Sequence, residues 1–525
     1  MKILQFVSPF IKVTCIIFIF LTLLFIPSCK NPEAFDKKDT IFLPLYRKNI
    51  SLNPLQAYDS ESAKVIKFLF EPLLDVNEKG EIIPNIIQQW NYSPDGLIWT
   101  FKVNRDVMWS DGEYLKTDDI IATLNYLRDP EKSPFFSEKL RPVNKFQRDD
   151  EYSFSVFLNE PYSPFPVILN SVYPVPEGSI LKNSKTPSGC GPYILKNSSD
   201  KTIYLSRNVH YRKNPGHIKN ICFRIYEQEE SALSDFLSDR IDLLDNMSVE
   251  QYTEIKDRDF VCFNYPEQSF TVMGFNFKSE IFRDRRIREA ISYSIDRDII
   301  VRYLLRRMGH ISTGPVNPFM SDWYNRDVKT YPFNLKKAET LLKEAGWYKG
   351  ESGFLEKNGK IFYFKLATNR GDRLRERVVT VIQQNLLQTG IAVDTVFMEK
   401  NEFLEKICTG SLDSWCIDFT GEAIDPDSMF YYFHSSAGPE LGNYGSYSNK
   451  EMDKLLFLGR RESDREKRKK IYYKLQSLVA EDLPAVYLCS RDRLVASSRR
   501  IEIPEETDGR YFNFYRDFCK WKIKE

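Results

Sequence analysis

The sequence has few of the residues and motifs from which enzyme sites are usually built. It contains 4 histidines in 525 residues, and they are too widely separated for the usual metal-ligand spacings. Neither a Gly-x-Ser-x-Gly pattern nor a P-loop occurs, so neither a serine hydrolase nor an ATPase is indicated. No nucleophile is paired with a recognisable base. We therefore expect no enzyme activity, no cofactor and no bound metal.

Cysteine pairs with redox or zinc-ribbon spacing are also absent, because no two of the 9 cysteines form Cys-x-x-Cys. Seven cysteines lie after Cys29, and this odd number leaves at least one thiol unpaired within a single chain. The formal net charge is +1, and no long charged block occurs beyond the short run 467–470. This balance argues against nucleic acid as the main partner.

A basic start followed by a short hydrophobic run marks the N-terminus. Lys2 and Lys12 precede Val13–Ile26, which is almost wholly apolar but shorter than the roughly 20 residues of a membrane-spanning helix. This pattern predicts a secretory signal peptide, residues 1–28. The sequence Ile-Pro-Ser-Cys that ends at Cys29 resembles a bacterial lipobox, which implies a lipidated Cys29 at the start of the mature chain. An uncleaved anchor helix is the alternative, and both place the rest of the chain outside the cytoplasmic membrane.

The remaining chain is larger than one hydrophobic core usually supports, so we expect two or three domains. Strand and helix patterns are mixed throughout, which indicates an α/β architecture. Residues 98–103 have the pattern of a strand, and Thr117 is expected to cap a helix. Gly346 is expected to end another helix, which precedes it in the sequence. Isoleucines at intervals of four predict the buried side of a helix, and they are Ile287, Ile291, Ile295 and Ile299.

The stretch Trp90–Pro130 carries a long motif that resembles the signature of the family 5 extracellular solute-binding proteins of ABC importers. The matching residues are Trp90, Ser93, Asp95, Gly96, Trp99, Thr100, Phe101, Val107, Trp109, Ser110, Asp111, Gly112, Thr117 and Asp119. Asn104 stands where the family usually has arginine, with Arg105 one place later. Shorter matches at 189–193, 282–297, 335–347 and 483–488 extend the resemblance over about residues 40–520.

The resemblance implies a two-lobed periplasmic-binding-protein-like (Venus-flytrap) fold with an extra third domain. Its lobes would be joined by hinge strands near residues 268 and 487, and closure around a ligand would be a rigid-body motion. The implied parts are a tether at 29–35, lobe I at 36–73, 187–268 and 487–525, the extra domain at 74–186, and lobe II at 269–486.

The same resemblance implies the function of a substrate-binding lipoprotein. Such a protein captures di- or oligopeptides between its lobes and delivers them to a membrane permease that is powered by a separate ATPase. We expect a monomer, attached through Cys29 on the periplasmic or cell-surface side of a bacterial membrane.

The stretch Trp415–His434 contains the candidate ligand site. It combines acidic and aromatic residues, and a carboxylate held against aromatic walls can bind an ammonium group because desolvation strengthens the ion pair. Asp-Pro-Asp is equally typical of a turn or a helix start. We therefore interpret Asp425 and Asp427 as residues that shape a turn.

The resemblance assigns the amine-binding role to a carboxylate just before that turn. Dipeptide receptors have the pattern T-G-D-x-x-D-P-D, in which the first aspartate pairs with the peptide's α-amino group. Thr420–Asp427 reads TGEAIDPD, so Glu422 takes this place, and Asp418 is the second candidate if the local register slips. Trp415 and Phe419 are the expected aromatic neighbours of the ligand.

Three alternatives remain. The chain could bind nickel or a metal chelate, like other members of the resembled family, with His434 nearest to the motif. It could instead be a surface lipoprotein that binds host or matrix proteins without transport, or a hydrolase on a borrowed scaffold.

Overall fold

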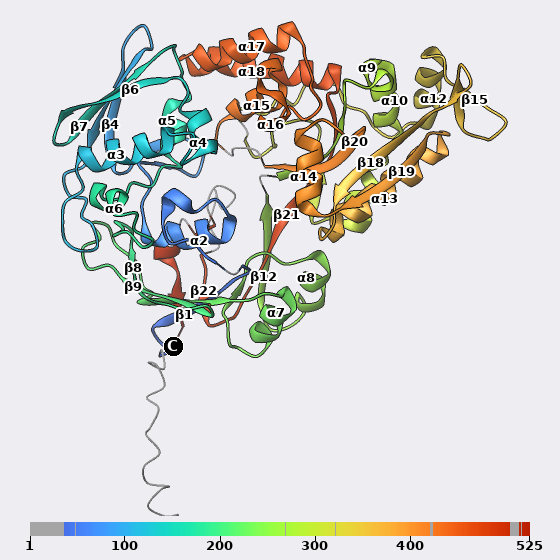
Figure 1. The fold of residues 1–525 in the computed structure, drawn as a ribbon. Coiled ribbons are helices and arrows are strands. Elements are labelled where there is room, and N and C mark those ends of the chain that lie inside the picture. Colours follow the sequence, from blue (N-terminus) through green and yellow to red (C-terminus); the bar gives the residue numbers. More distant parts are fainter. Residues whose placement is uncertain are drawn as a thin grey trace, which may run out of the picture.

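The computed structural model describes the chain in seven segments, which are residues 36–47, 49–267, 269–320, 322–420, 424–504, 514–515 and 517–524. The predicted signal peptide, tether and lipidated Cys29 therefore lie outside the described residues. Figure 1 shows the described chain as sheet-based units, with the extra domain at upper left, lobe I below and lobe II at the right.

Lobe I is built on a four-stranded sheet in which β1 pairs in parallel with β10 and the other pairs are antiparallel. Across the sheet its strands are β1 (Thr40–Leu45), β10 (Asn220–Ile225), β9 (Thr202–Arg207) and β8 (Tyr193–Ser198). Its helices are α2 (Ser60–Leu69), α7 (Glu229–Leu237) and α8 (Val249–Ile255). Helix α2 begins where the Asp59 carboxylate accepts a hydrogen bond from the Ser62 amide.

The extra domain is built on an antiparallel sheet whose inner face is aromatic. Its strands, in spatial order, are β4 (Ile87–Tyr92), β5 (Ile98–Val103), β7 (Ser153–Leu158) and β6 (Val143–Asp150). Its helices are α3 (Thr117–Arg128), α4 (Pro134–Lys139), α5 (Phe165–Leu169) and α6 (Glu177–Leu181). Phe101 and Phe154 stack with ring centroids 5.1 Å apart, and both are fully buried.

The predicted strand 98–103 is confirmed, but the predicted cap of the following helix is wrong by one residue. Helix α3 starts at Thr117 itself, and Lys116 is its N-cap. The Asp119 carboxylate accepts a hydrogen bond from the Lys116 amide at 3.0 Å, so an acidic side chain inside the first turn binds the N–H of the N-cap residue.

The largest sheet of the described residues has eight strands and extends from lobe II into lobe I. Its main path runs through β11 (Leu243–Leu244), β21 (Ala485–Ser497), β13 (Ser269–Phe275), β20 (Ser414–Thr420), β18 (Tyr363–Asn369) and β19 (Ala392–Met398). Two further strands pair with β21 alone, and they are β12 (Val261–Pro266) and β14 (Gly309–Ile311).

Helices cover both faces of this sheet. The longer ones are α10 (Arg285–Ser294), α12 (Leu335–Glu344), α13 (Arg373–Gln388), α14 (Lys400–Cys408), α17 (Lys450–Arg461) and α18 (Arg465–Asp482). The shorter ones are α9 (Glu280–Arg283), α11 (Arg297–Ile299), η3 (Pro426–Ser428), α15 (Met429–Phe433) and α16 (Gly438–Leu441). Gly346 follows α12 with a φ of +84°, which confirms it as the residue that stops this helix.

The predicted isoleucine stripe is correct for three of its four positions. Ile287, Ile291 and Ile295 are buried, but α10 ends at Ser294 and Ile299 is only half-buried. The reason is local: the Asp296 carboxylate accepts hydrogen bonds from the amides of Asp298 and Ile299 and starts the separate helix α11.

Strand β21 connects the two lobes. Its first part pairs with β13, and its last six residues pair with β12 from Asp492 to Ser497. In Figure 1 this strand runs from lobe II down into lobe I beside β12. The chain passes directly from β12 to β13, so two neighbouring strands join the lobes. The exact domain boundaries given above remain predictions.

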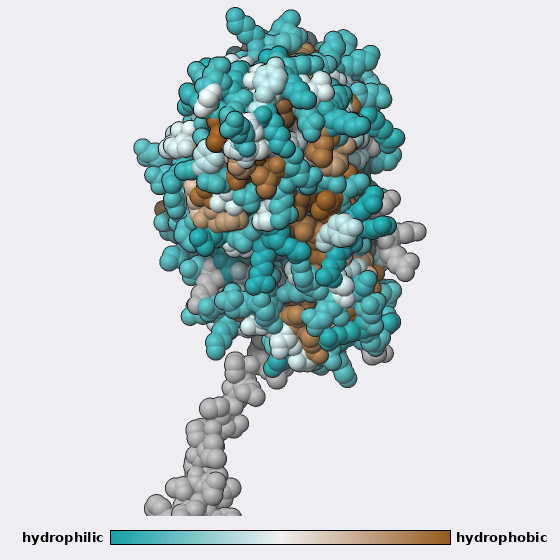
Figure 2. All heavy atoms as spheres, turned by 90° about the vertical axis from the view of Figure 1, so that its right-hand side faces the viewer, coloured by the Kyte–Doolittle hydropathy of each residue, from teal (hydrophilic) through white to brown (hydrophobic). Residues whose placement is uncertain are grey.

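The surface is predominantly hydrophilic on the side that carries α12 and α13, with smaller hydrophobic patches between charged residues (Figure 2). None of the helices in the described part of the chain is both long and apolar enough to cross a membrane.

We predict that Gly274→Ala destabilises lobe II. Gly274 pairs with Trp415 across β13 and β20, and a Cβ at Gly274 would lie 2.4 Å from the indole ring. The buried indole must shift, and overpacking of this kind costs about 1–3 kcal/mol. The denaturant midpoint of unfolding measures the effect.

Gly178→Ala in α6 is the matched control, because a Cβ there meets nothing within 4 Å. We expect this control to leave stability unchanged or slightly raised, since alanine favours helix. Equal denaturant midpoints for Gly274→Ala and Gly178→Ala would show that the Trp415 indole can accommodate a Cβ at position 274 without loss of stability.

Candidate functional site

Strand β20 brings Asp418 to the side of lobe II that faces the hinge. Asp418 pairs with Thr271 of β13, two residues after β13 begins. The Thr271 hydroxyl donates a 2.7 Å hydrogen bond to Oδ1 of Asp418, and Nη1 of Arg375 lies 3.4 Å from Oδ2. The Asp418 side chain keeps 19% of its surface exposed. It is a partly open carboxylate whose charge is balanced by one arginine.

Arg375 is held in place by groups other than Asp418. It lies in the first turn of α13, where its amide donates to the N-cap carboxylate of Asp372. Its Nη2 donates to Oδ1 of Asn369 at 2.9 Å and lies 3.3 Å from Asp372. Arg375 is therefore positioned even without Asp418, and a ligand cation can share the Asp418 carboxylate with it.

The predicted aromatic residues of β20 are mainly packed within lobe II. Trp415 is 3% exposed and belongs to a core cluster with Phe403 and Ile407 of α14. Phe419 is 9% exposed and stacks on Tyr432 with ring centroids 4.4 Å apart. These contacts leave little ring surface for a ligand, and they stiffen the strand that carries Asp418. Their ligand contacts remain predictions.

Glu422 lies outside the described residues, as do its neighbours Gly421 and Ala423. Its proposed contact with the ligand therefore stays a prediction. The structure describes the chain again from Ile424, where the Asp-Pro-Asp turn begins.

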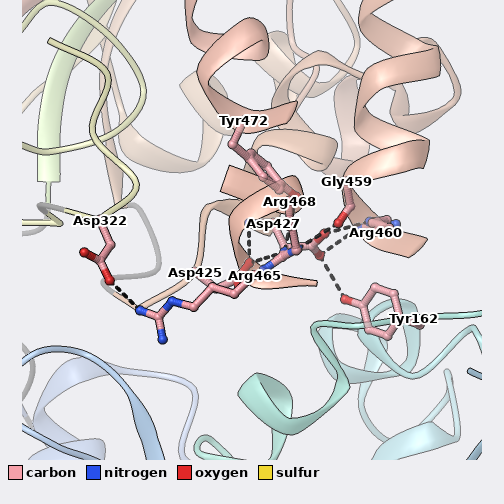
Figure 3. A network of polar contacts seen from close by, with 9 residues as sticks. All are labelled: Tyr162, Asp322, Asp425, Asp427, Gly459, Arg460, Arg465, Arg468 and Tyr472. Carbon is pink, nitrogen blue, oxygen red and sulfur yellow. Dashed lines mark hydrogen bonds and ion pairs between the residues drawn. The ribbon is translucent and has the colours of Figure 1, made fainter. Parts of the chain in front are cut away.

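Asp425 and Asp427 are buried and paired with arginines, and Asp425 is confirmed as a turn residue because its carboxylate caps η3. Asp425 accepts the Asp427 amide at 2.9 Å and Nη2 of Arg468 at 2.7 Å. Asp427 receives Nε and Nη2 of Arg460 at 2.9 and 3.0 Å. Figure 3 shows that both arginines reach the turn from the α17–α18 hairpin, while Tyr162 approaches Asp427 from the extra domain.

The sequence did not reveal a chain of charged residues along the hinge. Lys64 of α2 lies 2.7 Å from Asp245, whose backbone oxygen accepts a 2.7 Å hydrogen bond from Nε of Arg493. Glu267 receives Nη1 of Arg493 at 3.2 Å and Nε of Arg491 at 2.7 Å. Arg491 and Arg493 are two residues apart on β21, so their side chains lie on the same face of the strand. Their partners are more than 200 residues away in sequence.

Electrostatics connect this chain of charges to Asp418. Burial alone would lower the pKa of the Arg491 guanidinium, but Glu267 and then Asp418 hold it above its usual value. In the same way, burial opposes ionisation of Asp245, and Lys64 and Arg493 nevertheless hold the pKa of its carboxyl below the usual value. Positive and negative groups thus alternate from lobe I to the candidate site.

A cavity of about 260 Å³ lies elsewhere in lobe II and contains none of the predicted site residues. Its walls include Arg297, Tyr331, Phe333 and Ala480. Burial lowers the pKa of Arg297 to about 10. The described hydrogen bonds of Arg297 go to carbonyl and hydroxyl oxygens, which hold three neighbouring segments together.

Within the described residues, no three His, Cys, Asp or Glu side chains are grouped so that they could hold a metal ion. His434, the nearest histidine to the motif, stacks on Phe430 with centroids 4.3 Å apart. Its Nδ1 accepts the Ser436 amide at 3.1 Å, and burial lowers its pKa. The ring is used in a local helix cap.

Residues 81–440 match the bacterial extracellular solute-binding proteins, family 5. The chain is 26% identical over 491 residues to the oligopeptide-binding protein AppA of Bacillus subtilis (strain 168), with 89% of each protein covered. The structure of that protein in complex with a nonapeptide gives a TM-score of 0.76 at 24% identity, covering 93% of this chain and 99% of that one.

A second solved structure is that of NikA from Brucella suis in complex with Fe(III)-EDTA. It gives a TM-score of 0.82 at 19% identity and covers 92% of this chain and 100% of that one. These likenesses confirm the predicted two-lobed α/β fold.

We predict that Arg468→Met strongly destabilises lobe II. Arg468 and Asp425 are nearly fully buried, and removal of the guanidinium leaves the carboxylate without its counter-charge. Breaking one side of such a pair costs about 3–5 kcal/mol. Urea unfolding measures the loss. Arg258→Met, which removes an exposed ion pair with Glu254, is the control and should change stability by less than about 0.5 kcal/mol. Similar losses in both variants would contradict the role assigned to the buried pair.

We also predict that Asp245 makes stability depend on acid pH. Its folded-state pKa lies below the unfolded value, so its contribution is complete above that value and is lost as the pH falls through the folded pKa. Wild type should exceed Asp245→Asn in unfolding free energy at pH 6, and the difference should shrink as the pH falls below about 4. Thermal unfolding between pH 6 and 2.5 tests this. A difference that is independent of pH would contradict it.

Proposed function

Because the chain belongs to the bacterial extracellular solute-binding proteins of family 5, we propose that it is the peptide-capturing component of an ABC importer. The observation that carries this proposal is the likeness, over 89% of the chain, to a protein named as oligopeptide-binding. The family consists of solute-binding proteins, and its members work outside the cytoplasm. In this proposal the chain binds a peptide, releases it unchanged to a membrane permease and hydrolyses no ATP.

The proposed mechanism is capture between the lobes. Glu422 or Asp418 would pair with the peptide's α-ammonium group, and the extended peptide backbone would form strand-like hydrogen bonds. A carboxylate offers about four acceptor positions, and Asp418 uses two of them for Thr271 and Arg375. Asp418 therefore retains the capacity to accept an ammonium group. Such recognition of the backbone tolerates many peptide sequences.

The proposed attachment is a lipid on Cys29. The tether 29–35 would hold the folded chain near its permease on the outer side of the membrane. Attachment through this lipid does not require a second copy of the chain, so we still expect a monomer.

We predict that peptides co-purify with the full mature chain and are identified by native mass spectrometry. Calorimetry with the identified peptide then compares wild type, Glu422→Gln and Asp418→Asn. The variant that loses the ammonium partner should bind about 10–100-fold more weakly, because a hydrogen bond to a charged group contributes about 1.5–3 kcal/mol.

Asp394→Asn is the control, because Asp394 lies on β19 at the far edge of the same sheet and contacts Tyr363. Equal affinity in all variants would remove both carboxylates from the amine-binding role. A stoichiometric metal chelate in place of peptide would overturn the peptide assignment and favour the nickel-type alternative. Cleavage of the bound peptide would favour the hydrolase.

A further inference from the structure

The extra domain touches lobe II at the Asp-Pro-Asp turn and the α17–α18 hairpin. The segment that follows β7, residues 160–163, lies against α17 and the Asp-Pro-Asp turn. The Tyr162 hydroxyl donates to Oδ2 of Asp427 at 2.9 Å, and the Ser163 amide donates to the Arg460 carbonyl at 2.7 Å. Figure 3 shows the Tyr162 ring entering this network from the extra domain, and the Arg460 guanidinium lies 5.5 Å from its ring centroid.

The centre of this contact is buried and charged. Tyr162 and Asp427 are each 4% exposed. The Arg460 guanidinium pairs with Asp427 and lies 3.4 Å from the ring centroid of Phe430. Burial, and then the negative charge of Asp427, raise the pKa of the Tyr162 hydroxyl, so it remains a donor at all physiological pH values. A hydrogen bond to a charged acceptor in such surroundings is stronger than one in water.

A second, exposed contact lies at the rim of the first. Arg461 and Glu160 form an ion pair at 3.0 Å, and both side chains are 42% exposed. A cavity of about 10 Å³, roughly the space of one water molecule, borders Tyr162 and Asp427. The interface is thus small and incompletely packed, which suits a contact that forms and breaks.

We propose that Tyr162, Ser163, Asp427 and Arg460 form a closure latch between the extra domain and lobe II. A hinge rotation that separates these two parts must break the hydrogen bonds of Tyr162 to Asp427 and of Ser163 to Arg460, together with the rim ion pair of Glu160 and Arg461. Asp427 keeps its Arg460 partner when it does so, because both residues belong to lobe II. Opening therefore leaves the buried Asp427 charge paired, and water replaces the neutral donors. Tyr162 acts as a positioning residue for the closed form and does not touch the ligand.

This latch sets the balance between the open and closed forms before any ligand arrives. A ligand that requires the closed form binds more tightly when that form is more populated. The latch therefore scales the affinity for every ligand, whereas Asp418 and Glu422 would discriminate among ligands. The inference goes beyond the proposed function and does not depend on the ligand being a peptide.

The amide of Ser163 gives a direct measurement, because its hydrogen bond exists only while the latch is closed. We predict that Tyr162→Phe speeds hydrogen exchange at this amide about tenfold in the ligand-free full mature chain, the effect of losing a hydrogen bond to a charged acceptor. Tyr447→Phe is the matched control, since its hydroxyl donates to Asp482 within lobe II, and it should leave the Ser163 rate within twofold. An unchanged Ser163 rate in Tyr162→Phe would overturn the latch.

A charge exchange at the rim provides a test that does not disturb the core. Glu160→Arg places two cations together and should speed Ser163 exchange at least threefold, while the double variant Glu160→Arg with Arg461→Glu should restore the wild-type rate. Both side chains are half-exposed, so folding is not at risk. An unchanged rate in the single variant, or an unrestored rate in the double variant, would show that this rim takes no part in closure. Because no ligand is added, these outcomes are independent of the peptide proposal.

Discussion

The relation between the lobes depends on one continuous strand. Strand β21 pairs with β13 in lobe II and with β12 in lobe I, and the change of partner falls between Cys489 and Asp492. A strand that is hydrogen-bonded to both β12 and β13 cannot slide without breaking both ladders at once. It can bend where the pairing changes. The lobes are therefore held at a fixed distance, and rotation about this short segment is the motion that the architecture permits.

Charged residues are concentrated at this segment, and they occur as pairs. Glu267, at the end of β12, receives Arg491 and Arg493 from β21, and Asp245 receives Lys64 from α2. Buried ion pairs add little net stability, because the desolvation of both charges offsets their attraction. Their geometry is nevertheless strict, since a displaced partner leaves an uncompensated charge. We infer that these pairs specify the angle between the strands more than they strengthen the fold.

The sequence predicted local elements well and long-range pairs poorly. Strand 98–103 and the stop at Gly346 follow from patterns a few residues long, and both are present. Ile299 left the predicted core because Asp296 supplies a cap within the same stretch, a competition between two local signals. The position of Asp418 beside Arg375 could not be predicted, because the chain offers 74 basic and 73 acidic residues and no local signal to match them. The same holds for Tyr162 and Asp427, which are separated by 265 positions.

Asp418 and Asp427 have different proposed roles, but each is paired with an arginine of its own lobe. Asp418, at the candidate ligand site, has Arg375 beside it, and Asp427, at the latch, has Arg460. Each arginine belongs to the same lobe as its carboxylate, so neither charge is left alone when the lobes separate. In the two proposals, what changes on closure is a ligand ammonium at Asp418 and a tyrosine hydroxyl at Asp427. The free-energy difference between the two forms can therefore stay within a few kcal/mol, which is the range that a bound ligand can reverse. A buried carboxylate paired only across the lobes would be left uncompensated on opening, and Asp418 and Asp427 avoid this because each has an arginine of its own lobe; the cross-domain pair Glu160–Arg461 is half-exposed to water.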